Sequence, residues 1–107
     1  MEGLELICFQ IISSVGTAKS CFIEATRAAE AYDFDKAEKL IEEGDEMFVK
    51  GHEAHASLIQ QEASGEPVQT TLLLVHAEDQ LMAAENFRSM AEQQIILYKK
   101  IQALEAK

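Results

Sequence analysis

Hydrophobic residues recur along the first third of the chain with the spacing of a helix that packs along its whole length. Between residues 4 and 32 the apolar positions alternate steps of four and three, the 3.5-residue repeat of a coiled-coil seam. They are Leu4, Cys8, Ile11, Val15, Ala18, Phe22, Ala25, Ala29 and Tyr32. Gly16 lies beside this seam, where it either allows another helix to approach closely or is simply tolerated. The pattern predicts one long first helix.

A second helix is predicted to begin after a short polar break. Asp35 and Glu38 have the spacing of a capping box, with Asp35 as the N-cap residue. One face of this helix is formed by Ala37, Ile41, Gly44, Phe48, Gly51, His55, Leu58 and Glu62. Residues 64–67 contain Gly and Pro in the order expected after a helix, so the second helix should end near Ala63.

The third segment, residues 69–106, has no Gly or Pro and is apolar on two adjacent stripes. The first stripe consists of Leu74, Ala77, Leu81, Ala84, Phe87, Ala91, Ile95 and Tyr98. The second stripe consists of Leu72, Val75, Asp79, Met82, Asn86, Met90, Gln93, Leu97, Lys100 and Leu104. The second stripe is interrupted by polar residues, and a helix with two apolar faces can serve two interfaces.

Three long helices with short connections predict an all-α fold, an antiparallel three-helix bundle, because a short loop returns each helix beside its predecessor. The length of 107 residues fits a single domain, residues 1–107, with little room for an enclosed active-site cavity. Only one stripe of the third helix is needed inside such a bundle. We therefore expect the second stripe to contact another chain, in a homo-oligomer with closed rotational symmetry built around the third helix.

The net charge of -10, from 19 acidic and 9 basic residues, argues against binding to nucleic acid or anionic lipid, since both require a Lys/Arg surface. Basic protein surfaces are the partners that this charge favours. Residues 1–5 lack the basic region of a signal peptide, and no apolar run approaches the about 18 residues of a membrane span. We expect a soluble cytoplasmic protein without direct membrane insertion. Cys8 and Cys21 fit no metal or redox spacing and are expected to be buried structural thiols.

Asp79 is the unusual residue of the second stripe, because a carboxylate at a seam must be solvated, paired, neutralised or bound to a cation. If the seam is a symmetry axis, several copies of Asp79 converge there. A hard divalent cation such as Mg²⁺, which takes oxygen ligands, would relieve their repulsion. Spacing alone favours a polar residue that sets the helix register, or an Asp that faces solvent, over a metal ligand.

His76 lies three residues before Asp79, so both side chains project from one side of the helix. Neutral imidazole is nucleophilic near pH 7 and can form a covalent intermediate, which makes His76 a candidate phosphoryl acceptor. A structural histidine fits the same pattern. His52 and His55 could share a metal site with His76, but the metal-binding spacings of di-iron bundles and zinc proteases are absent. Packing or hydrogen bonding is the simpler role.

The run of residues 72–82, LLLVHAEDQLM, resembles the active-site segment of the lactose/cellobiose-specific IIA component of the bacterial phosphotransferase system. The resemblance covers nearly the whole chain, including residues 51–55 (GHEAH), residues 61–66 (QEASGE) and several positions of the first helix. It implies a phosphotransferase component in a homotrimer of three-helix subunits. It also implies that HPr, the small histidine phosphocarrier protein, phosphorylates His76, and that the group then passes to a cysteine of the IIB component during β-disaccharide uptake.

The same resemblance implies that Asp79 meets its two copies around a divalent cation, Mg²⁺, one per trimer. The chain departs from the family at Gln80, where a His is usual, and at Glu78, where a Gln is usual. Gln80 can donate a hydrogen bond but carries no charge, which leaves donor preference and retention of transfer activity open.

Two other interpretations remain. One is a non-catalytic, acidic helical assembly or adaptor protein, and the other is a regulatory relative that keeps the fold but has lost transfer. An adaptor would tolerate replacement of His76, whereas a phosphocarrier would not.

Overall fold

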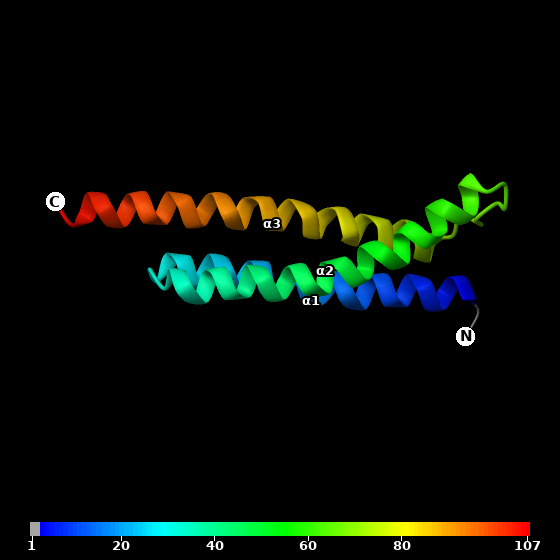
Figure 1. Cartoon of the computed structure of the whole chain (residues 1–107), viewed down its shortest axis with the longest axis horizontal. Coiled ribbons are helices and arrows are strands. Elements are labelled where there is room, and N and C mark those ends of the chain that lie inside the picture. The colour runs from blue at the N-terminus through cyan, green and yellow to red at the C-terminus, as the bar shows by residue number, and fades with distance from the viewer. Residues whose placement is uncertain (1–2) are drawn as a thin grey trace.

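The computed structural model describes residues 3–107, which form three long helices and no strand (Figure 1). Helix α1 spans Gly3–Glu30, α2 spans Phe34–Ala63 and α3 spans Leu72–Glu105. The all-α prediction is confirmed. Met1 and Glu2, which belong to the N-terminal stretch without basic residues, lie outside the described residues.

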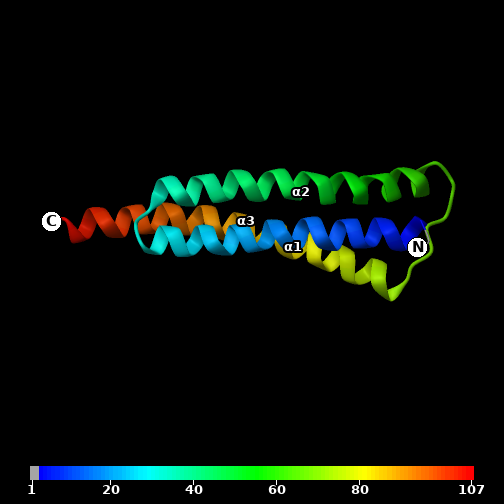
Figure 2. The ribbon, with the colours of Figure 1, turned by 90° about the horizontal axis from the view of Figure 1, so that it is seen from below.

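The helices form an elongated up-down-up bundle of 61 × 22 × 20 Å. Helix α1 lies against both other helices, while α2 and α3 touch each other much less. Figure 2 shows that α1 and α3 run in the same direction, and that α3 continues past the turn between α1 and α2. The start of α1, the end of α2 and the start of α3 therefore lie at one end of the molecule, and the C-terminus lies at the other.

The core is built from the predicted seam of α1 and the first stripe of α3. Cys8, Ile11, Val15 and Phe22 are fully buried. The buried residues of α3 are Leu74, Ala77, Leu81, Ala84, Ala91 and Ile95. Phe87 is the exception in that stripe, because its side chain stays 36% exposed while the small Ala84 and Ala91 on either side are buried. Six of the eight predicted positions of the first stripe are therefore buried, and Tyr98 is partly buried against the core. On the predicted face of α2, Glu62 is exposed.

Close helix contact occurs at Gly44 and Gly51 of α2 and not at Gly16. A Cβ atom built on Gly51 would lie 2.6 Å from a methyl carbon of Val15. A Cβ atom on Gly16 would meet nothing within 4 Å, so Gly16 is only tolerated within this chain. The backbone of α2 can approach α1 closely because its two buried glycines carry no side chain.

The capping box expected at Asp35 and Glu38 is wrong. The N-cap of α2 is Asp33, whose side chain accepts a hydrogen bond from the Lys36 backbone amide at 3.3 Å. Tyr32, expected to end the seam, lies beyond α1 in the left-handed conformation with φ 61°. This turn starts α2 two residues earlier than a cap at Asp35 would.

The connection from α2 to α3 follows the predicted stop signals. Helix α2 ends at Ala63 as predicted, and Gly65 has a φ of +95°, which favours glycine. Helix α3 begins at Leu72 rather than at residue 69 because Thr71 is its N-cap. The Thr71 hydroxyl accepts from the Leu74 amide at 3.1 Å.

By length and composition α1 could cross a membrane, which corrects the expectation that no segment of the chain approaches a span. Its apolar residues are nevertheless the centre of the bundle, since it buries one face against α2 and α3. Cys8 lies fully within this core, whereas Cys21 is only partly buried, and both thiols are free. Burial raises the pKa of Cys8, and the nearby carboxylates Glu78 and Glu5 raise it further.

Candidate functional site

The first turns of α3 fix the direction in which His76 and Asp79 point. The Thr71 cap sets where the helix begins, and burial of Leu74 and Ala77 sets its rotation about its own axis. His76 and Asp79 consequently lie on the exposed side of α3. Residues three apart on a helix have Cβ atoms about 5–6 Å from each other, so His76 and Asp79 are neighbours on the helix surface.

Exposed apolar side chains lie next to these two residues on α3. Val75 is 49% exposed and Met82 is 55% exposed, and both belong to the second stripe of α3. The stripe continues toward the C-terminal end of α3 with Met90, Leu97 and Leu104, whose side chains are 53–67% exposed. An imidazole and a carboxylate thus stand at one end of a long, uncovered hydrophobic face.

Glu78 points in a different direction and binds α2. Its Oε2 atom accepts a hydrogen bond from Nε2 of His55 at 2.9 Å, and His55 is the more buried partner, with 15% of its side chain exposed. This contact ties α2 to the turn of α3 that carries His76 and Asp79. Gln80, one turn after His76, is half-buried.

The structure does not bring the three histidines together. His55 pairs with Glu78, His76 is exposed on α3, and the exposed His52 ring lies 6.1 Å from the ring of Phe48. Within residues 3–107 no three His, Cys, Asp or Glu side chains are grouped so that they could hold a metal ion. Asp79 offers a single carboxylate per chain, so a cation there would need ligands from further copies of the chain.

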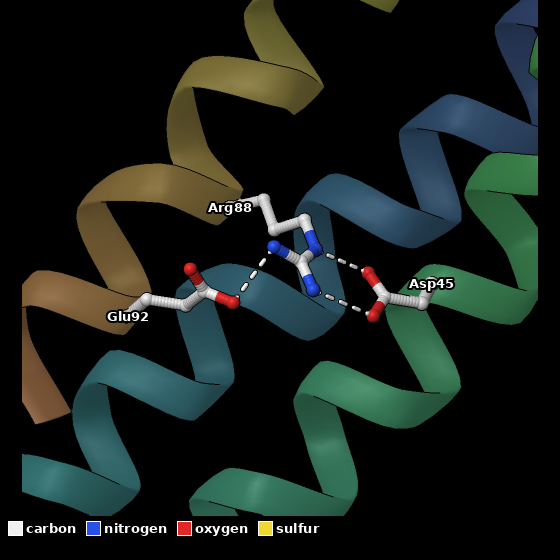
Figure 3. A network of polar contacts seen from close by, with 3 residues as sticks. All are labelled: Asp45, Arg88 and Glu92. Atoms are coloured by element: carbon white, nitrogen blue, oxygen red, sulfur yellow. Dashed lines mark hydrogen bonds and ion pairs between the residues drawn. The ribbon is translucent and has the colours of Figure 1, made fainter.

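An ion-pair network between α2 and α3 was not foreseen from the sequence. Arg88 of α3 binds both carboxylate oxygens of Asp45 on α2 and also pairs with Glu92, one turn along α3, at 2.7 Å (Figure 3). The hydrogen bond to Asp45 raises the pKa of Arg88, which therefore stays charged. The i,i+4 pair of Arg88 and Glu92 is visible in the sequence, but the partner on α2 is not.

An open groove of about 580 Å³ lies beside this network, lined by Asp45, Phe48, Val49, Glu85, Asn86, Arg88 and Ser89. Its polar lining consists of two carboxylates, one amide, one guanidinium and the hydroxyl of Ser89. The groove connects α2 with the exposed stripe of α3 through Asn86. His76 is exposed on α3 and does not line this groove.

The fold and this surface define a class of protein: a small all-α bundle with an exposed histidine near the start of its third helix. The family model of the phosphotransferase-system lactose/cellobiose-specific IIA subunit matches residues 6–99. The chain belongs to this family. The resemblance noted from the motif at residues 72–82 is therefore confirmed.

Similar proteins match this chain over nearly its full length. The chain is 43% identical over 100 residues to the lichenan-specific phosphotransferase enzyme IIA component of Bacillus subtilis, covering 94% of this chain and 91% of the relative. It is 37% identical over 99 residues to the lactose-specific EIIA component of Staphylococcus epidermidis, covering 92% and 95%. The crystal structure of the cellobiose-specific enzyme IIA from Bacillus anthracis superposes with a TM-score of 0.93 at 36% identity, covering 96% and 94%.

Membership of this family gives the protein its general role. It is a phosphoryl-carrier component of a sugar phosphotransferase system. Components of this kind act with HPr and with a IIB component.

Proposed function

We propose that His76 accepts a phosphoryl group from HPr and passes it to a cysteine of the IIB component, in a system that takes up a β-linked saccharide. The observation that carries the proposal is the position of His76, exposed on the first turns of α3 beside the exposed apolar side chains of Leu72 and Val75. Both phosphoryl donor and acceptor must reach the ring, and a surface histidine is accessible to each in turn.

The chemistry consists of two in-line displacements. In the first, an imidazole nitrogen of His76 attacks phosphorus, and the phosphorus–nitrogen bond to the donor histidine breaks as the new one forms. In the second, His76 is the leaving group when the cysteine thiolate of the IIB component attacks. No phosphate is released and no nucleotide is consumed by this chain.

The transferring group carries negative charge that this acidic chain is poorly placed to stabilise. Asp79 lies one turn from His76, and Glu78 is occupied by His55. Positive charge around the phosphoryl oxygens would therefore come from the partner proteins, which also fits the net charge of -10. The apolar surface around His76 would help to exclude water while a partner is docked.

The proposal includes a homotrimer in which the second stripes of three α3 helices meet. The support is the exposure of that stripe over its whole length, although α3 already buries its first stripe within the bundle. Copies of Asp79 would converge on the axis, and their oxygens would suit Mg²⁺, one ion per trimer. We place the trimer in the cytoplasm, without insertion into the membrane.

Intact mass spectrometry tests the central step. The protein is incubated with phosphoenolpyruvate, the general phosphotransferase enzyme and HPr, beside the His76→Ala variant and the matched His52→Ala variant. We expect one added phosphoryl group, labile to acid and stable to base, on the parent and on His52→Ala but not on His76→Ala. No addition to the parent while HPr is phosphorylated would favour an adaptor or a relative that has lost transfer.

A further inference from the structure

Polar residues interrupt the exposed stripe of α3 at a fixed interval. Asp79, Asn86, Gln93 and Lys100 follow one another every seven residues, and all are exposed. Apolar residues lie between them, with Met82 at 55%, Met90 at 56% and Leu97 at 53% exposure. Seven residues are close to two turns of helix, so the polar positions form one line along the face.

The interval has a consequence when copies of α3 meet around a rotation axis. Closed symmetry brings identical residues to the same height on the axis. Asn86 then meets Asn86, and Gln93 meets Gln93, with a layer of apolar side chains between them. The stripe becomes an alternation of polar and apolar layers.

Amide side chains are suited to such layers. Each Asn or Gln amide has both donor and acceptor atoms, so identical amides around an axis can each donate to the next copy and accept from the previous one. If α3 were rotated about its own axis, Asn86 or Gln93 would face Met side chains and lose these bonds. A buried amide without a partner destabilises the assembly, so the layers favour one orientation of the helix.

We propose that Asn86 and Gln93 determine which face of α3 turns inward and how many copies assemble in parallel. This inference rests on the proposed homotrimer and adds the residues that make it specific. Two amide layers lower the stability of the seam in comparison with apolar residues, while they exclude other packings, as a single buried Asn does in parallel coiled coils.

The pattern leaves one competing arrangement, in which two copies of α3 run antiparallel. The stripe then pairs Asp79 with Lys100, Asn86 with Gln93 and Met82 with Leu97. This pairing is favourable in charge, but it sets amides of different length against each other. It also separates the two copies of Asp79, whereas the parallel arrangement brings all copies together.

Leucine substitutions test the role of the amides. The parent, Asn86→Leu/Gln93→Leu and the control Gln102→Leu, an exposed glutamine outside the stripe, are compared by native mass spectrometry and thermal unfolding. We expect the parent and the control to be a single species of three 11.9 kDa chains. The double variant should have a Tm higher by on the order of 5 °C and form a mixture of assembly sizes. A double variant that remains one trimer with an unchanged Tm would overturn the inference.

Cysteine cross-linking tests the orientation. In the parallel arrangement, oxidation of Met82→Cys alone should join chains at that position, whereas the antiparallel one would join chains only when Met82→Cys is mixed with Leu97→Cys. The parent, which keeps Cys8 and Cys21, is the oxidation control. Cross-linking only in the mixture would refute the parallel layers.

Phosphoryl uptake by the parent, measured beside its assembly state, separates this inference from the proposed function. A monomeric parent that still takes up one phosphoryl group on His76 would reject the amide layers and the trimer and leave the carrier role intact. A trimeric parent that takes up no phosphoryl group would reject the carrier role and leave the amide layers and the trimer intact.

Discussion

Glu78 and Asp79 are adjacent in the sequence but have different surroundings. Glu78 faces α2 and binds His55, while Asp79 lies on the exposed side of α3 with His76. Neighbouring helix positions point about 100° apart, so one helical turn can present one carboxylate to the bundle and another to solvent. The pairing with His55 keeps the Glu78 carboxylate on the side of α3 that faces α2.

A double-mutant cycle measures what this pairing contributes. His55→Ala and Glu78→Ala should each lower the free energy of unfolding, and the double variant should lose less than the sum, with a coupling of about 0.5–1.5 kcal/mol. The pair His55→Gln/Glu78→Gln should recover part of the coupling, since two amides can share a hydrogen bond. Urea unfolding at fixed protein concentration is the measurement, and strictly additive losses would show that the contact contributes nothing.

At the scale of helices, α1 and α2 pack closely because Gly44 and Gly51 of α2 face α1. Gly51→Ala would push a methyl group into Val15, whose side chain is fully buried. We expect a loss of about 1–3 kcal/mol in the free energy of unfolding. Gly16→Ala is the matched control, since its Cβ meets nothing, and it should gain about 0.5–1 kcal/mol from lower chain entropy. Equal effects at the two positions in thermal unfolding would contradict the packing described above.

Helix faces could be predicted from the sequence because burial in a bundle follows the 3.5-residue spacing directly. The N-cap of α2 could not, because Asp33 and Asp35 are both suitable residues. The choice depends on the turn before them. There the amides of Tyr32 and Asp33 donate to the carbonyls of Ala29 and Ala28, each at 2.9 Å, with Tyr32 in the left-handed conformation that Gly usually takes.

The candidate site was predictable only as a set of positions on one helix. The motif at residues 72–82 pointed to His76 and Asp79, and helical spacing placed them on one side of α3. The contacts of Glu78 with His55 and of Arg88 with Asp45 were missed, since they join residues 23 and 43 positions apart. Such contacts depend on how α2 and α3 cross, which local pattern does not specify.

For the whole molecule, one carboxylate per chain makes any cation on Asp79 a property of the assembly. If copies of Asp79 converge, their repulsion should weaken the trimer once divalent cations are removed. We expect EDTA to lower the fraction of trimer in analytical ultracentrifugation and added Mg²⁺ to restore it. The Asp79→Asn variant should assemble equally well with and without EDTA. An EDTA effect that persists in Asp79→Asn would locate the cation elsewhere.

The subunit is a rod, and its two ends are not equally suitable for fusing a tag. His76 lies about 29 residues before the end of α3, and at a rise of about 1.5 Å per residue the C-terminus is some 44 Å away from it. The start of α1 lies at the same end of the rod as the start of α3 (Figure 2), and the first turns of α3 carry His76. A fluorophore or affinity tag fused after Lys107 should therefore leave the docking of partner proteins unhindered, whereas the same tag fused ahead of α1 would compete with them for space.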